Sequence, residues 1–279
     1  MKLVGIVIKS KSPEAVKSSD VLVQYLKSMS IDSVVIPSRV DGMDKETKEK
    51  LPRCDLAFTF GGDGTLLFAS RIFSGFRVPI VGINLGGLGF ITEFKESEVI
   101  ECMEDILQGR QNYEERMMID VRVCREGNCL YTTTGLNDLV INTGGISRLI
   151  ELEVSSGKSF IGTYRADGII IATPTGSTAY SLAAGGPILE PTMKALVISP
   201  ICPHSLGARP LVIPTEDSIR IRVVSKHREI NATIDGQVAV DTGYMDEIKV
   251  EKSDTVTRLV SLGKRSFYDI VRQKLYWKG

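Results

Sequence analysis

The sequence of 279 residues has no excess charge of either sign and no long hydrophobic run. Lys and Arg together number 34, as do Asp and Glu, so the net charge is zero. A broad basic field, typical of proteins that bind nucleic acid or anionic membranes, is therefore absent. No apolar run approaches the roughly 20 residues of a membrane-spanning helix. We therefore expect no nucleic-acid partner and no membrane partner. Residues 1–8 resemble a strand rather than a signal peptide, so we expect a cytoplasmic location.

Cysteine and histidine are also scarce. The five cysteines are odd in number and scattered, which favours reduced thiols over a disulfide framework. Cys124 and Cys129 are the closest pair, and we expect two strand-end thiols there rather than a zinc site. The two histidines, His204 and His227, are expected to be structural. A histidine general base is therefore not among the candidates.

The order of strand and helix patterns predicts two domains. Apolar runs at 3–8, 55–60 and 78–83 are typical of strands buried on both faces, and helical patterns separate them. From residue 116 onward, short β-rich segments alternate with turns, and 266–277 has the spacing of an amphipathic helix. We predict an α/β N-terminal layered domain at 1–115 and a β-rich C-terminal domain at 116–263.

A glycine-rich loop follows the strand at 55–60. Gly61, Gly62, Asp63, Gly64 and Thr65 lead directly into a helical pattern. Backbone N–H groups at a helix N-terminus bind anions, and glycine permits close approach of the backbone to a phosphate. Asp63 would repel phosphate, so it suits a base for an attacking hydroxyl, or a metal partner. The alternative is a plain turn with Asp63 as a helix cap.

Two common phosphate-binding patterns are missing. Gly157-Lys158-Ser159 lacks the glycine that a P-loop places five residues earlier, and it is typical of a hairpin turn. The dinucleotide pattern G-x-G-x-x-G also fails, because Leu67 stands where the third glycine belongs. The loop at 61–65 is thus of another kind.

That loop resembles the signature shared by NAD kinases, diacylglycerol and sphingosine kinases, and phosphofructokinases. Four further motifs resemble NAD kinases in order and spacing across nearly the whole chain. They are NLGGLGFIT at 84–92, LND at 136–138, DG at 167–168 with TPTGSTAY at 173–180, and DGQ at 235–237. By this resemblance the chain is similar to the NAD kinase family, whose members phosphorylate the 2′-hydroxyl of the adenosine ribose of NAD to give NADP.

The resemblance implies a role for each matching residue. Asp63 would accept the proton of the ribose hydroxyl, and Gly61, Gly62, Gly64 and Thr65 would form the phosphate loop. Asn137 and Thr178 would contact the adenine, and Asp138 the ribose hydroxyls. Asp167 would lie toward the nicotinamide. The remaining predicted NAD-binding residues are Gly64, Arg148, Arg165, Ala179, Tyr180, Ser181, Ala183, Asp235 and Gln237. Arg148 and Arg165 could equally be solvated surface charges.

The resemblance also implies partners. The phosphoryl donor would be ATP or another donor such as polyphosphate, with a divalent cation, Mg²⁺, neutralising its phosphates; the protein ligands of this metal are not identified. A homodimer or homotetramer is expected, with the β-rich domain as its interface. The C-terminal segment, 264–279, would return to pack on the first domain.

Two alternatives remain. A lipid kinase of the diacylglycerol or sphingosine type shares the loop at 61–65, but it needs an apolar acceptor pocket, whereas the acceptor motifs here are polar. A non-catalytic sensor of NAD or NADP would not need the carboxylate of Asp63, which is present.

Overall fold

The computed structural model describes residues 1–39, 43–87, 89–92, 94–143, 149–226, 229–261 and 263–277. The chain forms two compact units. Unit 1 comprises Met1–Arg116 and Thr255–Gly279, and unit 2 comprises Met117–Asp254. Two long strands, β5 (Asn112–Arg125) and β16 (Glu247–Ser261), carry the chain from one unit to the other. The chain therefore re-enters unit 1 at Thr255, within β16, rather than at the expected residue 264.

Unit 1 is built on a parallel sheet. Its strands lie in the order β2 (Asp32–Pro37), β1 (Leu3–Ile8), β3 (Leu56–Gly61) and β4 (Pro79–Asn84). The last part of β16 extends this sheet as a further parallel strand, with Arg258 and Leu259 opposite Pro79 and Ile80. Strands β1, β3 and β4 are nearly continuous apolar sequence, as expected for strands covered on both faces.

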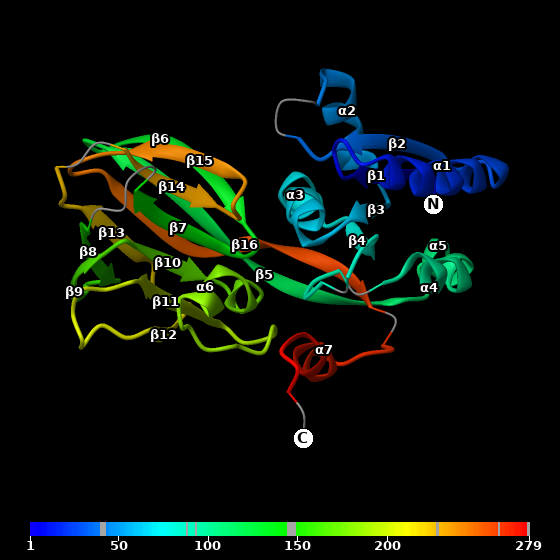
Figure 1. The fold of residues 1–279 in the computed structure, drawn as a ribbon. Helices are drawn as coiled ribbons and strands as arrows, with labels where there is room; N and C mark the ends of the chain where they lie inside the picture. The colour runs from blue at the N-terminus through cyan, green and yellow to red at the C-terminus, as the bar shows by residue number, and fades with distance from the viewer. Residues whose placement is uncertain are drawn as a thin grey trace. The chain divides into compact units, whose positions relative to one another are not determined.

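Helices cover both faces of this sheet (Figure 1). The side chains of α1 (Pro13–Ser28), α4 (Glu96–Glu101) and α5 (Met103–Leu107) share a core with alternate residues of β1, β3 and β4. Helix α3 (Asp63–Phe73) packs on the other face, where a Cβ at Gly5 would lie 2.9 Å from the ring of Phe73. Shorter helices are α2 (Lys45–Lys50), η2 (Leu51–Arg53) and η3 (Ser74–Phe76). The α/β prediction for the first domain is confirmed.

The C-terminal helix α7 (Phe267–Lys274) belongs to unit 1. Ser266 caps it by accepting a hydrogen bond from the backbone N–H of Asp269. Its apolar residues Ile270 and Val271 are buried. Just before the helix, Arg265 forms an ion pair of 2.7 Å with Glu98 of α4. These contacts confirm the predicted return of the C-terminal helix to the first domain.

Unit 2 contains two groups of antiparallel strands. One sheet has the order β12 (Leu211–Pro214), β11 (Ala195–Ile201), β10 (Gly168–Ala172), β7 (Asp138–Thr143), β14 (Ile230–Ile234) and β15 (Val238–Thr242). The other group joins β16 to β13 (Ile219–Val223), β8 (Ile150–Ser156) and β9 (Ser159–Ala166), and also to β5, which pairs with β6 (Asn128–Gly135). Between β10 and β11 lie the short helices η4 (Gly176–Thr178) and α6 (Tyr180–Ala183).

The core of unit 2 lies between these two layers. Alternate residues of its strands point into it, such as Ile169 and Ile171 of β10, while Ile170 between them contributes to a second cluster on the outer face. This alternation is the two-residue period of a sheet. The β-rich prediction for the second domain is confirmed. Among the described residues, no helix combines the length and apolar character needed to cross a membrane.

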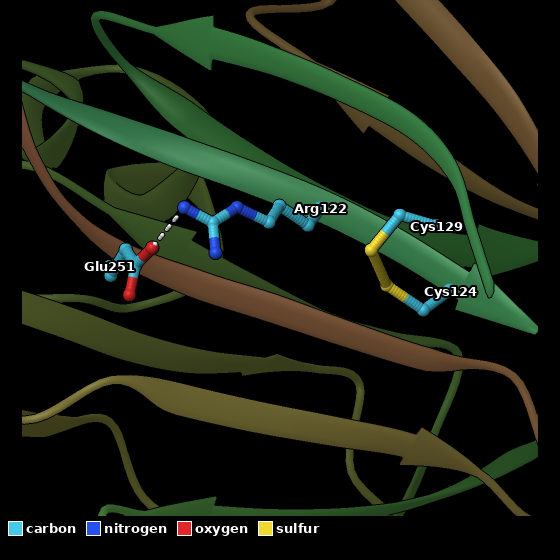
Figure 2. Close-up of a disulfide and its surroundings, with 4 residues drawn as sticks. All are labelled: Arg122, Cys124, Cys129 and Glu251. Carbon is cyan, nitrogen blue, oxygen red and sulfur yellow. Dashed lines mark ion pairs between the residues drawn. A yellow bond between two sulfur atoms is a disulfide. The ribbon is translucent and has the colours of Figure 1, made fainter. Parts of the chain in front are cut away.

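The prediction of reduced thiols at Cys124 and Cys129 was wrong. These residues are joined in a disulfide at the end of the β5–β6 hairpin (Figure 2). The hairpin register makes them direct cross-strand partners, with Cα atoms 4.0 Å apart. On the same strand, Arg122 forms an ion pair of 2.8 Å with Glu251 of β16. Cys54, Cys102 and Cys202 are free thiols, as expected.

Candidate active site

The glycine-rich loop joins the end of β3 to the start of α3 in unit 1. Gly61 is the last residue of the strand, Gly62 is the N-cap and Asp63 is the first residue of the helix. A Cβ at Gly61 would overlap the side chain of Thr65, which is buried against it. Gly62 has open space beside its Cα and Gly64 is exposed. The predicted phosphate loop is thus at a helix N-terminus, with the hydroxyl of Thr65 directed toward Gly61 rather than toward solvent.

The carboxylate of Asp63 is held by the segment at 90–92. Its Oδ1 accepts hydrogen bonds from the backbone N–H groups of Ile91 and Thr92, at 3.3 and 3.0 Å, and from the hydroxyl of Thr92 at 2.8 Å. Its Oδ2 accepts one, from the N–H of Phe90 at 3.0 Å. A carboxylate offers about two acceptor positions on each oxygen. Among the described residues, Oδ2 therefore keeps one position for a further donor.

The hydroxyl of Thr92 is itself oriented by Asn84. The side-chain amide of Asn84 donates to this hydroxyl at 2.9 Å and to the carbonyl of Gly87 at 2.8 Å. Gly89 is needed here because a Cβ would overlap the carboxylate of Asp63. The segment at 90–92, oriented by Asn84, thus serves as a cradle for Asp63. Asn84 and Thr92 were not predicted as site residues, although their motif was recognised.

The loop at 61–63, the segment at 84–87 and Gly89 line a pocket of about 360 Å³. Its walls include two cationic side chains, Lys9 and Lys274, and two carboxylates, Asp63 and Glu14. Lys9 follows β1, and parallel strands end at a common edge where ligands of such sheets bind. The sequence therefore held a signal for Lys9. Lys274 belongs to α7, where its ammonium lies 5.7 Å from the ring centre of Phe90. Its local sequence gives no indication that it lines this pocket.

Unit 2 carries the other predicted residues. Asn137 lies between β6 and β7, and Asp138 is the first residue of β7. Asn137 is only 7% exposed, yet its Oδ1 has no hydrogen-bond partner among the described residues. A buried acceptor without a partner costs stability, and in a motif that resembles a nucleotide site this atom is suited to a ligand donor.

Asp138 is buried close to a second carboxyl group, that of Asp235. Burial, and then the negative charge of Asp235, raise the pKa of Asp138 from its usual value to about 7. Perturbed carboxyl groups of this kind are common at functional sites.

The segment at 173–180 packs directly on Asn137. The backbone N–H of Thr173 donates to the carbonyl of Asn137 at 2.8 Å, and a Cβ at Gly176 would overlap that carbonyl. Thr178 and Ala179 are half-buried, and the hydroxyl of Thr178 donates to the carbonyl of Thr175 at 3.1 Å. The structure therefore brings the 136–138 and 173–180 motifs together.

The other predicted NAD-binding residues differ in burial and in their contacts. The hydroxyl of Ser181 is buried and bonded to that of Ser199 at 2.9 Å, while Tyr180 and Ala183 are exposed. Asp167 and Gln237 are half-buried. The side chain of Arg165 is 61% exposed and pairs with Glu151 at 3.4 Å, as expected for a solvated surface charge. Arg148 lies outside the described residues.

Comparison with known proteins agrees with this site. Residues 4–111 match the ATP-NAD kinase N-terminal domain and residues 136–262 match the ATP-NAD kinase C-terminal domain. The NAD kinases of Heliobacterium modesticaldum and Trichlorobacter lovleyi are 40% and 42% identical, each alignment covering 99% of both chains. The lipid-kinase alternative receives no support from these relatives.

Solved structures show the same fold. Yeast NADH kinase complexed with NADH superposes with a TM-score of 0.90 at 25% identity, over 100% of this chain and 88% of that one. An NAD kinase from Archaeoglobus fulgidus in complex with ATP has a TM-score of 0.76 at 23% identity, over 96% and 98% of the two chains. The chain therefore belongs to the NAD kinase family, whose members are enzymes that phosphorylate NAD.

Proposed function

We propose that this chain transfers the γ-phosphoryl group of ATP to the 2′-hydroxyl of the adenosine ribose of NAD, giving NADP and ADP. The observation that carries the proposal is the carboxylate of Asp63. It is held by four hydrogen bonds beside a glycine-rich helix N-terminus, with one acceptor position left on Oδ2 among the described residues. A base of fixed orientation next to an anion site is what phosphoryl transfer to a hydroxyl requires.

Asp63 acts as the general base in this proposal. The 2′-hydroxyl donates to Oδ2, and its proton passes to that oxygen as the bond from O2′ to phosphorus forms. The bond from phosphorus to the bridging β,γ-oxygen breaks, and ADP leaves. Positioned general bases typically contribute about 10²–10⁴ in rate. Oδ1 is occupied by three donors, so the cradle at 90–92 selects Oδ2 for this task.

The donor's phosphates are assigned to the pocket of unit 1. Lys9 and Lys274 supply positive charge, and the glycines at 61, 62, 86, 87 and 89 allow backbone to approach closely. The Archaeoglobus relative was solved in complex with ATP, which supports ATP as the donor. Since the described walls of the pocket hold no feature specific to a base or ribose, other phosphoryl donors such as polyphosphate are compatible with it.

The dinucleotide is assigned to unit 2. The unpartnered Oδ1 of Asn137 is a buried acceptor suited to the exocyclic amino group of adenine. The carboxyl of Asp138 is suited to the ribose diol, and Thr178, Ala179 and Tyr180 to the walls of the nucleotide pocket. The yeast relative was solved in complex with NADH, a dinucleotide of the same kind.

We propose Mg²⁺ as the metal that accompanies the donor. Among the described residues, no three His, Cys, Asp or Glu side chains cluster as a metal site. This fits Mg²⁺, which is commonly held by substrate phosphates, water and one or two carboxylates. Glu14, in the wall of the phosphate pocket, is the candidate protein ligand. When bound, the ion would neutralise phosphate charge as the transfer proceeds.

We also propose that the protein forms a homodimer or homotetramer through unit 2. Its proposed location is the cytoplasm, where NAD and ATP are available. Strand β12 is an edge of the six-stranded sheet and exposes Leu211 and Val212. Exposed apolar edge strands are suited to pairing with another chain. Light scattering of the purified protein would give the number of subunits.

An enzyme assay tests the proposed reaction. The protein is incubated with NAD⁺, ATP and Mg²⁺, and the product is detected with a dehydrogenase that accepts NADP⁺ but not NAD⁺. We expect NADP⁺ to accumulate in step with ADP. ADP without NADP⁺, or no product with either ATP or polyphosphate, would contradict the proposal.

A further inference from the structure

The segment at 136–138 has all its backbone polar groups bonded. On its N–H side, Asp235 accepts from Leu136 through Oδ2 at 2.9 Å, and from Asn137 and Asp138 through Oδ1 at 2.7 and 3.2 Å. On its carbonyl side, Thr173 binds the oxygen of Leu136 through its hydroxyl at 2.6 Å and that of Asn137 through its N–H at 2.8 Å. The N–H of Asp235 donates to the carbonyl of Asp138 at 2.9 Å.

The turn that carries Asp235 fixes the direction of its side chain. Asp235 and Gly236 have positive φ angles of 51° and 64°, between strands β14 and β15. Aspartate is among the few residues other than glycine that adopt this conformation readily. Strand β14 pairs with β7, which begins at Asp138, so the turn lies at the end of β7 where the segment enters. Asp235 itself is only 6% exposed.

The side-chain oxygen of Asn137 takes no part in these bonds. With the backbone of 136–138 satisfied on both sides, Oδ1 of Asn137 is left as a buried acceptor without a partner among the described residues. Rotation of the segment to satisfy it would break several of the six bonds. The bonds to Asp235 and Thr173 therefore fix the backbone of Asn137 so that its Oδ1 can accept a hydrogen bond from a ligand, not from the protein.

We infer that Asp235 is a positioning residue for dinucleotide binding, which fixes the backbone of Asn137 and Asp138 without contacting the ligand itself. This inference rests on the proposed function, because it takes Asn137 and Asp138 as dinucleotide-binding residues. It also changes the expected role of Asp235 from a direct contact to an indirect one. The carboxylate accepts three N–H groups, and bonds from N–H groups to a charged acceptor are the stronger kind.

The charge of Asp235 has a second consequence for the same segment. It lies close enough to Asp138 to contribute, after burial, to the raised pKa of that carboxyl group. A neutral residue at 235 would remove this contribution. Asparagine keeps one oxygen for the N–H groups of Asn137 and Asp138, but its amino group would face the N–H of Leu136. Asp235→Asn therefore loses part of the hydrogen bonding to the 136–138 backbone, and Asp235→Ala loses all of these side-chain bonds.

The test compares these two variants with Asn137→Ala and with a control, Asp241→Asn. Asp241 lies on β15 opposite Asn231, at the end of the strand away from the turn, and its exposed side chain has no hydrogen bond or ion pair among the described residues. For each protein we would measure the dissociation constant of NAD⁺ by calorimetry, KM for NAD⁺ and for ATP, kcat, and the melting temperature. The NAD⁺ dissociation constant does not depend on catalysis.

We expect Asp235→Ala to raise KM and Kd for NAD⁺ about tenfold to a hundredfold, as the loss of charged hydrogen bonds implies. Asp235→Asn should lie between this variant and the wild type. KM for ATP and kcat should change by less than about twofold, and Asp241→Asn should match the wild type. If Asp235→Ala fails to fold, Asp235→Asn decides the matter by the same criteria.

Unchanged NAD⁺ affinity in a folded Asp235 variant would overturn the inference. So would equal losses in NAD⁺ and ATP affinity, since these indicate a general structural defect. If Asn137→Ala weakens NAD⁺ binding and the Asp235 variants do not, only the positioning role fails. If the wild type binds no NAD⁺ and makes no NADP⁺, the proposed function fails, and the positioning role that depends on it is overturned with it.

Discussion

The hydroxyl of Thr92 donates a hydrogen bond of 2.8 Å to Oδ1 of Asp63. Asn84 donates to the same hydroxyl, so three side chains from two loops form a chain that ends at the proposed base. Removing this hydroxyl should leave the amide of Asn84 with one acceptor, the carbonyl of Gly87, and Asp63 with one donor fewer. The expected effect is on the orientation of the base rather than on the binding of either substrate.

Replacement of Thr92 by valine should therefore lower kcat about tenfold or more, as the loss of one hydrogen bond to a charged group implies, with KM for NAD⁺ nearly unchanged. Steady-state kinetics would measure this, and Thr92→Ser should recover most of the rate. Thr59→Val is a matched control, because the buried hydroxyl of Thr59 has no partner among the described residues. Equal rates for Thr92→Val and the wild type would show that this hydroxyl does not position the base.

Asn137 gives a prediction on the acceptor substrate. Asn137→Ala should raise KM for NAD⁺ about tenfold, because a buried hydrogen bond to the ligand is lost, while KM for ATP stays the same. Asn231→Ala, on the neighbouring strand β14, is the control and should behave as the wild type. An unchanged dissociation constant for NAD⁺ in Asn137→Ala would remove this residue from the dinucleotide site.

Lys274 gives the corresponding prediction on the donor. Lys274→Gln should raise KM for ATP several-fold, since it removes a cation from the wall of the phosphate pocket, and it should leave KM for NAD⁺ unaltered. Lys274→Arg keeps the charge and should be milder. Lys48→Gln, on the exposed helix α2, controls for loss of a surface charge. A Lys274→Gln enzyme with normal ATP dependence would place the phosphates elsewhere.

The buried carboxyl of Asp138 predicts a pH-dependent stability. Burial and the charge of Asp235 raise the pKa of Asp138 to about 7, above the unfolded value near 3.9. The folded state then holds more protons than the unfolded state between these values, so the free energy of unfolding should fall as pH rises from about 4 to 7. The total loss is up to about 4 kcal/mol for a shift of this size.

Urea unfolding at a series of pH values, for the wild type and Asp138→Asn, would measure this loss. Asparagine cannot ionise, so the variant should lose less stability between about pH 4 and 7 than the wild type does. Parallel pH profiles for the two proteins would show that Asp138 titrates normally in the folded state.

Much of the fold could be predicted from the sequence because local signals agree with tertiary structure there. The apolar runs at 3–8, 55–60 and 78–83 each lie within one residue of a strand of the structure. Strand β9 could not be predicted from hydrophobic pattern, because all its residues except Ala166 are exposed or half-buried. Strand β16 is longer than the short β-rich segments expected after residue 116, because polar residues in its middle continue the same strand.

The residues of the candidate site also fall into those that the sequence predicted and those that it did not. Motif order located Asp63 and Asn137, because each motif is a short local sequence. Lys274 and the bonds from Asp235 to the 136–138 segment could not be predicted, since these partners are brought together only by the fold. The Cys124–Cys129 disulfide was missed for a related reason: its formation depends on the register of the β5–β6 hairpin, which composition does not reveal.

The rate of NADP⁺ formation by Asp63→Asn tests the central claim most directly. The carbonyl oxygen of asparagine can take the place of Oδ1 and keep its three donors, so the loop at 90–92 should stay largely intact. Asp105→Asn, on α5, serves as the control. We predict a fall in kcat of about 10²–10⁴, the usual contribution of a general base, with NAD⁺ affinity retained. An Asp63→Asn enzyme that turns over at the wild-type rate would contradict the account.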